Sequence, residues 1–366
     1  SAGLRIEAAK VLSRATFTYG VDAVRDDATA KDSAWSRTTG FGPAPIVSSN
    51  TRPSLPDADM SNLGAFVQGD WRLHDRFSLI TGVRHHEVHA ETRKTTGLPD
   101  STAGLVANNR TTVYAVNGIY RVTDYLSAVA TYGRGFRAPN LIERYFSGPS
   151  TDGTAIQIAN PALEPETSRN VDVGLRFNFK RVDAEYFYFR NNLRDGILTR
   201  PTGRMIGRQA EYQNINVERL RTYGHEASLR IDLTRGFDLT SNYTKLETKN
   251  PDSPDIPVAG TYSSKLNAAL GYRPSSGRYW AEGAVRHQGR QQDINLGESP
   301  IGPVLPSFTV VNLRGGLRVA TIGGRPQDLA LAINNVGNAL YAEAANSAFV
   351  RPEPGRHVVL SVRTSF

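Results

Sequence analysis

The chain has 366 residues, no cysteine, and a formal net charge of +8, from 43 Lys and Arg against 35 Asp and Glu. The lack of cysteine excludes a disulfide framework and any thiolate metal site. A mean hydropathy of -0.39 and the absence of an apolar run of about 18 residues exclude a transmembrane helix.

Alternating apolar and polar residues predict long β-strands along the whole chain. Turns of two to five residues join the strands in pairs, and longer polar loops separate the pairs; one long loop is expected through Asn50 and Pro56. No composition break divides the chain, so we expect one body. In chain order, the expected strands are 4–11, 16–26, 62–73, 77–88, 112–121, 125–136, 169–179, 182–190, 223–233, 237–247, 262–273, 279–288, 308–319, 328–334 and 357–366.

The segment 169–190 shows this alternation most clearly. Every second residue from Val171 to Phe179 is apolar, and polar residues and a glycine occupy the positions between them. After Lys180 and Arg181 the alternation resumes, with Val182 as its first apolar residue. A period of two is typical of strands, so the sequence predicts a hairpin with one apolar face and one charged face.

The length of these strands favours a membrane over a soluble sandwich. Strands in soluble proteins usually have about five or six residues, whereas a tilted strand needs about nine to eleven residues to cross a bilayer. Short turns at one end and long loops at the other are typical of bacterial outer-membrane barrels. The fold class that we predict is therefore all-β, an antiparallel transmembrane β-barrel of outer-membrane type.

The strand count indicates an incomplete barrel. About fifteen strands are expected in the sequence, whereas single-chain bacterial barrels normally have an even number. An open sheet in lipid would leave backbone groups without hydrogen-bond partners. No signal peptide is visible and the chain opens in a strand, so we expect the natural N-terminus to lie upstream.

The basic balance does not indicate a nucleic-acid partner. The sequence pI of about 9.7 would suit one, but Lys and Arg are spread through nearly every segment instead of forming one patch or helix. Basic side chains in a lumen and in outer loops would favour anionic solutes. Tyrosines lie mostly near the strand ends, as in the aromatic girdles of membrane barrels. They are Tyr120, Tyr125, Tyr132, Tyr186, Tyr188, Tyr223, Tyr243, Tyr272 and Tyr279.

Two proline-containing motifs flank one long loop. GFRAPN closes a strand, because proline removes a ladder donor and restricts the preceding residue to extended geometry. NPALEPE leads into the next strand, and its prolines keep that approach non-helical. We favour strand punctuation over direct ligand contact for both. Their residues are Gly135, Phe136, Arg137, Ala138, Pro139 and Asn140 in the first motif, and Asn160, Pro161, Leu163, Pro165 and Glu166 in the second.

The C-terminal strand carries a third signature. Leu360, Val362 and the terminal Phe366 end an alternating segment, after the sequence INNVGNALY at 333–341. Together with GFRAPN and NPALEPE, these features resemble the C-terminal barrel region of TonB-dependent outer-membrane receptors. The resemblance extends from about residue 3 to the end, and it implies that Leu360, Val362 and Phe366 form the signal for barrel insertion.

The resemblance implies much of the organisation. Receptors of this family have a twenty-two-stranded barrel around an N-terminal plug, so residues 1–366 would be a partial barrel domain without the plug and the first strands. The implied protein is a multi-pass barrel in the outer membrane of a Gram-negative bacterium, not an enzyme, and without a cofactor. Its implied partners are an iron-chelate ligand, the lipid bilayer, the barrel assembly machinery, and the inner-membrane TonB energy complex through the missing N-terminal region.

The implied function is active uptake of a ferric siderophore or a similar iron chelate. A passive porin, or a receptor of the same family for cobalamin or haem, stays open as an alternative. Haem receptors of the family tend to have a histidine between the two motifs, where an imidazole can ligate iron; residues 136–165 contain none. An outer-membrane enzyme is disfavoured because no GxSxG motif is present.

Candidate ligand contacts are Arg137, Arg144 and Arg110, because guanidinium groups near the outer mouth bind carboxylate, catecholate or hydroxamate oxygens well. His86 and His89 are further candidates for iron. His85, Glu87 and His89 would share one strand face, but we favour solvated polar residues there and predict no metal site. Arg84, Arg176 and Arg230 are expected to face the lumen. We favour pairing of such arginines with Asp172, Glu185 and Glu226 as wall braces over ligand contact.

Overall fold

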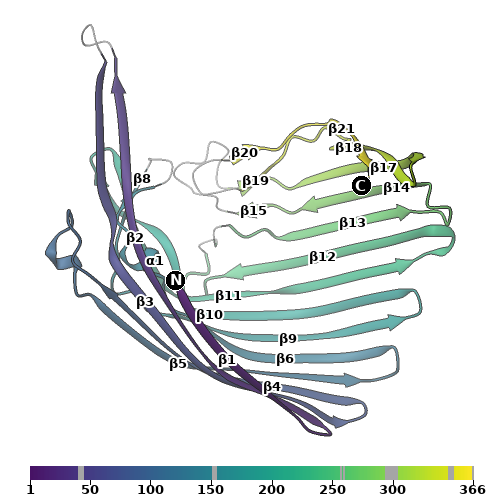
Figure 1. Ribbon diagram of the computed structural model, residues 1–366, viewed down its shortest axis with the longest axis horizontal. Coiled ribbons are helices and arrows are strands. Elements are labelled where there is room, and N and C mark those ends of the chain that lie inside the picture. The colour runs from purple at the N-terminus through teal and green to yellow at the C-terminus, as the bar shows by residue number, and fades with distance from the viewer. Residues whose placement is uncertain are drawn as a thin grey trace.

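A computed structural model describes residues 1–39, 45–150, 155–255, 258, 260–292, 304–344 and 350–364. It contains a 17-stranded sheet and two small two-stranded sheets. Among the described residues, no helix has the length and apolar character of a membrane span. The long strands lie side by side in one curved wall (Figure 1).

The main sheet is built almost entirely from antiparallel neighbours in chain order. Two of its 17 strands are the short β7 and β8, which leaves fifteen long strands, the number expected from the sequence. The long strands are β1 (Ala2–Val11), β2 (Ala15–Thr38), β3 (Ile46–His74), β4 (Phe77–Thr92), β5 (Val106–Arg121), β6 (Leu126–Arg137), β9 (Glu166–Phe179), β10 (Val182–Ile206), β11 (Gln209–Asp232), β12 (Phe237–Lys249), β13 (Ser264–Tyr272), β14 (Tyr279–Gln288), β17 (Phe308–Ile322), β18 (Arg325–Asn334) and β21 (His357–Thr364).

The remaining elements are short. They are the strands β7 (Gly148–Pro149), β8 (Ala155–Ile158), β15 (Gln291–Gln292), β16 (Val304–Leu305), β19 (Ala342–Ala344) and β20 (Val350–Pro352), the helix α1 (Leu141–Tyr145), and the 3-10 turns η1 (Asp100–Thr102) and η2 (Thr234–Gly236). The strand β8 makes a parallel pairing with β11, through Ala155 and Ala210.

The expected tight turns are confirmed. β9 and β10 pair with Phe179 opposite Val182, so the turn consists of Lys180 and Arg181 as predicted. Lys180 has a positive φ of 53°, which the tight turns between twisted antiparallel strands require. The short turns gather at one end of the sheet and the long connections at the other (Figure 1).

One expected loop is wrong. The segment through Asn50 and Pro56 belongs to β3, which pairs with β2 up to Thr38 opposite Ile46. Register shifts between Ala28 and Lys31 accommodate the prolines of β3, because a bulge tolerates a residue that lacks a ladder donor. The resulting hairpin projects far beyond the rest of the sheet (Figure 1).

The two faces of the sheet differ in chemistry. Val173, Leu175 and Phe179 of β9 are 50%, 47% and 44% exposed, on the face that also carries the exposed Tyr186 of β10. The other face of the same hairpin carries the ion pair of Arg176 and Glu185 (3.2 Å). We call the first face outward and the second inward. Large apolar side chains left exposed on one face of a long sheet are what contact with lipid requires.

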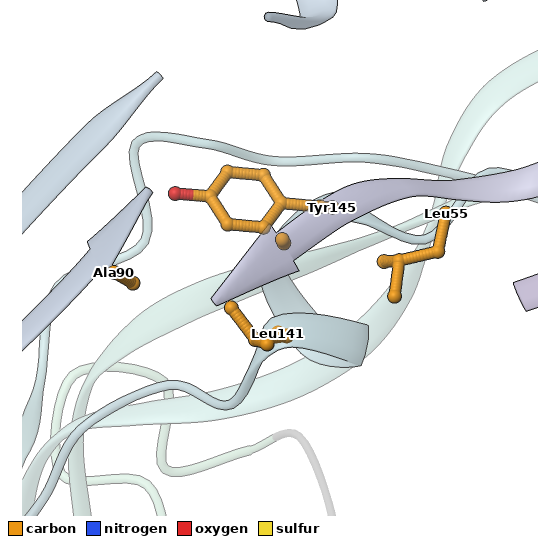
Figure 2. Packing of buried hydrophobic residues seen from close by; sticks show 5 residues of the cluster. Leu55, Ala90, Leu141 and Tyr145 are labelled. Atoms are coloured by element: carbon orange, nitrogen blue, oxygen red, sulfur yellow. The ribbon is translucent and has the colours of Figure 1, made fainter. Parts of the chain in front are cut away.

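The inward face holds a small buried core at the long-connection end. Leu141 and Tyr145 of α1 pack against Leu55, Ala58 and Ala90 of the wall, and Figure 2 shows this packing around the helix. Leu55 is 2% and Tyr145 is 3% exposed. The core fixes α1, and with it the loop between β6 and β9, against the inner side of β3 and β4.

The last strand, β21, pairs with β18. Leu360 and Val362 share its outward face, where they are 65% and 70% exposed. Phe366, the third residue of the expected insertion signal, lies outside the described residues. The alternation predicted for this strand is therefore present up to Thr364.

Candidate functional site

The GFRAPN motif ends β6 and starts α1. β6 ends at Arg137, two residues before Pro139 as expected, and Asn140 then caps the helix. Its side-chain oxygen accepts a hydrogen bond from the Glu143 backbone N–H (2.8 Å), and the Glu143 carboxylate accepts one from the Asn140 N–H (2.9 Å). This reciprocal capping box stabilises the start of a helix.

Arg137 connects the two motifs. Its Nε donates to Oε2 of Glu166 in NPALEPE (2.6 Å), and its Nη1 donates to Oε2 of Glu143 (2.7 Å). Oε1 of Glu166 accepts from the backbone N–H of Ile197 on β10 (2.7 Å). The guanidinium thus has two carboxylate partners. Its hydrogen bonds join β6, α1 and β9, and Glu166 extends the junction to β10.

Arg144 holds the second motif against α1. The residue is 4% exposed, its Nη1 donates to the carbonyl oxygen of Pro161 (2.7 Å), and its own carbonyl accepts from the Asn160 N–H (2.9 Å). Burial lowers the pKa of this guanidinium from its ordinary value. Its Nε has no hydrogen-bond partner among the described residues. With so little exposed surface, Arg144 is placed to brace the loop.

Two asparagines of β11 complete the arrangement and were not found from the sequence. The Asn160 side chain donates to the carbonyl of Asn214 (2.8 Å), and the Asn214 side chain donates to the carbonyl of Glu143 (2.8 Å). Asn216 accepts from the backbone N–H of Glu164 and donates to its carbonyl, at 2.8 and 2.9 Å. The available signal was two asparagines at alternate positions, with the apolar Ile215 and Val217 in between and after them.

We call these residues together the motif cluster: Arg137, Asn140, Glu143, Arg144, Asn160, Leu163, Glu166, Asn214 and Asn216. Leu163 is 2% exposed within it. The cluster is a hydrogen-bonded junction, and its partners within the protein support our interpretation that both motifs terminate and hold strands.

The candidate ligand contacts lie on different faces. His86 faces inward, and its ring lies 6.1 Å from that of Phe136 in GFRAPN. Its Nε2 accepts a hydrogen bond from Nε of Arg84 (2.9 Å). By strand alternation, Arg110 and His89 face outward: Arg110 lies 3.3 Å from Glu87, and Nδ1 of His89 lies 2.7 Å from Oδ1 of Asn108. Of these residues, the structure brings only His86 close to the motifs.

The histidine-rich segment of β4 has paired side chains. Nε2 of His85 lies 3.8 Å from Glu87, and Nε2 of His89 lies 3.7 Å from Glu91. These four residues alternate along one face of the strand. In the part of the chain that the structure describes, no group of three His, Asp or Glu side chains could hold a metal ion.

The inward arginines pair with carboxylates, although not always with the expected ones. Arg84 makes a two-point pair with Asp22, at 2.7 Å for each guanidinium nitrogen, and Arg176 pairs with Glu185. Arg230 lies 3.6 Å from Asp232 instead of pairing with Glu226. No arginine partner of Asp172 is found among the described side chains. The pair of Arg84 and Asp22 joins β4 to β2 across β3.

Comparison with known proteins decides the family. Residues 5–336 match the model of the family described as TonB dependent receptor-like, beta-barrel. The chain belongs to the TonB-dependent receptor family. Members of this family are outer-membrane β-barrels that act as receptors and transporters, so the chain is not an enzyme.

Individual relatives are distant. The chain is 24% identical over 403 residues to the heme/hemopexin utilization protein C of Haemophilus influenzae, covering 100% of this chain and 51% of that protein. It is 26% identical over 277 residues to the ferric enterobactin receptor PirA of Pseudomonas aeruginosa, covering 69% of this chain and 36% of the receptor. The chain spans about half the length of the first of these TonB-dependent receptors.

The fold agrees with solved barrels. The structure titled copper transporter OprC matches with a TM-score of 0.78 and 20% identity, over 98% of this chain and 55% of that one. At this identity the similarity concerns the fold alone. It supports the description of the fifteen long strands as the wall of a TonB-dependent barrel.

Proposed function

We propose that the chain forms part of the barrel of an outer-membrane receptor that takes up a ferric siderophore or a similar iron chelate. In this proposal residues 1–366 are a partial barrel domain, and a plug and further strands belong to the whole protein. The TonB complex would supply energy through that N-terminal region, and the barrel assembly machinery would insert the wall.

The observation that carries the proposal is the joining of both motifs into the motif cluster at the long-connection end, beside an inward-facing arginine and histidine. Arg84 and His86 lie on the inner side of β4, and Phe136 links this part of the wall to GFRAPN. Ferric siderophores are often anionic and present oxygen atoms, which guanidinium groups bind. The names of relatives such as the ferric enterobactin receptor PirA agree with this substrate class.

Haem is a second candidate because one residue favours it. His86 is an inward-facing imidazole near a family motif, and an imidazole can ligate haem iron. The name of the heme/hemopexin utilization protein C points to the same substrate for that relative. For iron to bind Nε2 of His86, the hydrogen bond from Arg84 would have to break.

Uptake of labelled compounds tests the proposal. The test uses cells that lack other ferric-chelate receptors and express the intact protein. These cells should take up a ferric catecholate or hydroxamate, and this uptake should stop when TonB is absent. Uptake of cobalamin alone, or uptake that continues without TonB as through a passive porin, would contradict the proposal.

Variants of two histidines distinguish haem from a siderophore as the substrate. If haem is the substrate, His86→Ala should abolish growth on haem, whereas His89→Ala should not, because His89 faces outward and bonds to Asn108. If a siderophore is the substrate, both variants should keep most siderophore uptake. Loss of growth on haem in both variants alike would contradict the role given to His86.

A further inference from the structure

The outward faces of three neighbouring strands change from apolar to basic at the same end of the wall. On β9 the outward residues are apolar from Phe179 to Val171, and the next outward residue is Arg169. On β10 the corresponding step is from Tyr188 to Arg190, and on β11 from Tyr223 to Arg221. We call Arg169, Arg190 and Arg221 the outward arginine patch.

The strand register brings the patch together. Asn192 of β10 lies opposite Arg169 on one side and opposite Arg221 on the other. Both Arg190 and Arg221 direct their Nε to the same oxygen, Oδ1 of Asn192, at 3.4 and 3.1 Å. Arg169 also lies directly opposite Arg134 of β6. Like charges in directly opposed positions destabilise a sheet, so this arrangement calls for an anion.

The described part of the protein supplies no carboxylate to the patch. No ion pair of these three arginines is found among the side chains that the structure describes. The nearest acidic residue along the row is Glu247 of β12, which lies 2.7 Å from Lys249 and also bonds to the Tyr223 hydroxyl. The patch is therefore a concentration of positive charge. Its nearby neutral hydrogen-bond acceptor is the side-chain amide of Asn192.

Two other outward arginines at this end of the wall have acidic partners. Arg25 of β2 lies 3.6 Å from Asp59, and Arg110 of β5 lies 3.3 Å from Glu87. On the other side of the patch, the outward positions near the ends of β13 and β17 are the neutral Ser264 and Thr309. Arg134 of β6 and Lys245 of β12, on either side of the patch, also face outward and have no ion pair among the described side chains. The patch on β9, β10 and β11, which lie side by side (Figure 1), is thus the centre of a row of uncompensated basic side chains.

We propose that the outward arginine patch binds the phosphate groups of lipid headgroups in the outer leaflet of the membrane. The patch lies directly beyond the apolar band that contacts hydrocarbon, and the tyrosines next to it are residues that prefer the headgroup level. Guanidinium forks bind phosphate oxygens in a two-point geometry. A lipid places its phosphate at this depth while its chains cover Val171 and Val173, which a free anion cannot do.

Native mass spectrometry of the folded barrel in nonionic detergent tests the proposal. The probes are a diphosphorylated glucosamine lipid (lipid A), the same lipid without its phosphates, and inorganic phosphate. We expect the protein to retain the phosphorylated lipid, and the triple variant Arg169→Gln/Arg190→Gln/Arg221→Gln to retain it at least about tenfold more weakly, because charge-assisted hydrogen bonds are lost.

The matched control removes the same charge at the other end of the wall. Arg181→Gln/Arg235→Gln/Arg273→Gln changes three arginines of the short turns and should leave lipid retention unchanged. A Lys version of the patch should fold and keep binding in part, which separates loss of charge from loss of fold. Three results would overturn the proposal: equal retention by the Gln variant, equal retention of the lipid without phosphates, or displacement of the lipid by inorganic phosphate at the same concentration.

Discussion

Leu175→Arg is expected to destabilise the folded barrel by about 2–4 kcal/mol, the cost of placing a basic side chain on the lipid face near the middle of a bilayer. Leu175 is the middle of the five outward apolar residues of β9, lies opposite Tyr186 and Ala128, and is 47% exposed. The measurement is the free energy of unfolding in denaturant, with the protein folded into phospholipid vesicles.

The matched control places the same charge on the inward face. Ser228 of β11 lies opposite Glu185 and faces the lumen, so Ser228→Arg meets water and a carboxylate. We expect its free energy of unfolding to change by less than about 1 kcal/mol. Equal destabilisation by the two variants would show that the two faces of the wall do not meet different solvents.

Arg84→Ala is expected to lower the free energy of unfolding by about 2–3 kcal/mol, because the largely enclosed Asp22 carboxylate loses both hydrogen bonds to the guanidinium. The side chains of Arg84 and Asp22 are 25% and 17% exposed and make two hydrogen bonds across β3. The double variant Arg84→Met/Asp22→Leu should recover much of this loss, since neither charge then remains. Additive losses in the double variant would contradict a direct pair.

Gly64 gives an independent route to the same pair. A Cβ at this position of β3 would collide with the guanidinium of Arg84. Gly64→Ala should therefore push Arg84 away from Asp22 and, like Arg84→Ala, lower the free energy of unfolding. Gly82 of β4 is the matched control, because a Cβ there meets only the Val67 carbonyl oxygen at 3.9 Å. We therefore expect β3 to need glycine at position 64, because the ion pair of Arg84 and Asp22 occupies the space of a Cβ there.

Much of the fold could be predicted because the period of two is a local property. The turn at Lys180 and Arg181, the end of β6 before Pro139, and the fifteen long strands follow from alternation and from residues that interrupt it. Each of these signals lies within a few residues of the feature that it specifies. The family resemblance also rests on short motifs, which explains why it could be recognised in a chain with distant relatives.

Features that depend on distant partners could not be predicted. β2 and β3 continue past Pro53 and Pro56 because the two arms pair with each other and tolerate bulges. β10 and β11 extend to Ile206 and Gln209, far beyond their predicted ends, for the same reason. Asparagine side chains that bond to a loop more than fifty residues away, such as Asn216 to the backbone of Glu164, leave little local signal.

The helix α1 was missed although its signal is local. Asn140 and Glu143 have the spacing of a capping box, but the expectation of a loop after Pro139 hid it. For the ligand residues, alternation could have assigned the faces: Arg84 and His86 lie on one side of β4, and His85 and His89 on the other. The height of each residue relative to the outer mouth can be assigned only once the register of the whole sheet is known.

Accessibility of two introduced thiols tests the central claim most directly. The chain has no cysteine, so Leu175→Cys and Ser228→Cys can each carry a single spin label in protein folded into vesicles. The account predicts that oxygen dissolved in the bilayer relaxes the label at position 175, and that an aqueous nickel chelate relaxes the label at position 228. Equal access of the nickel chelate to both labels would contradict a wall whose outward face contacts hydrocarbon.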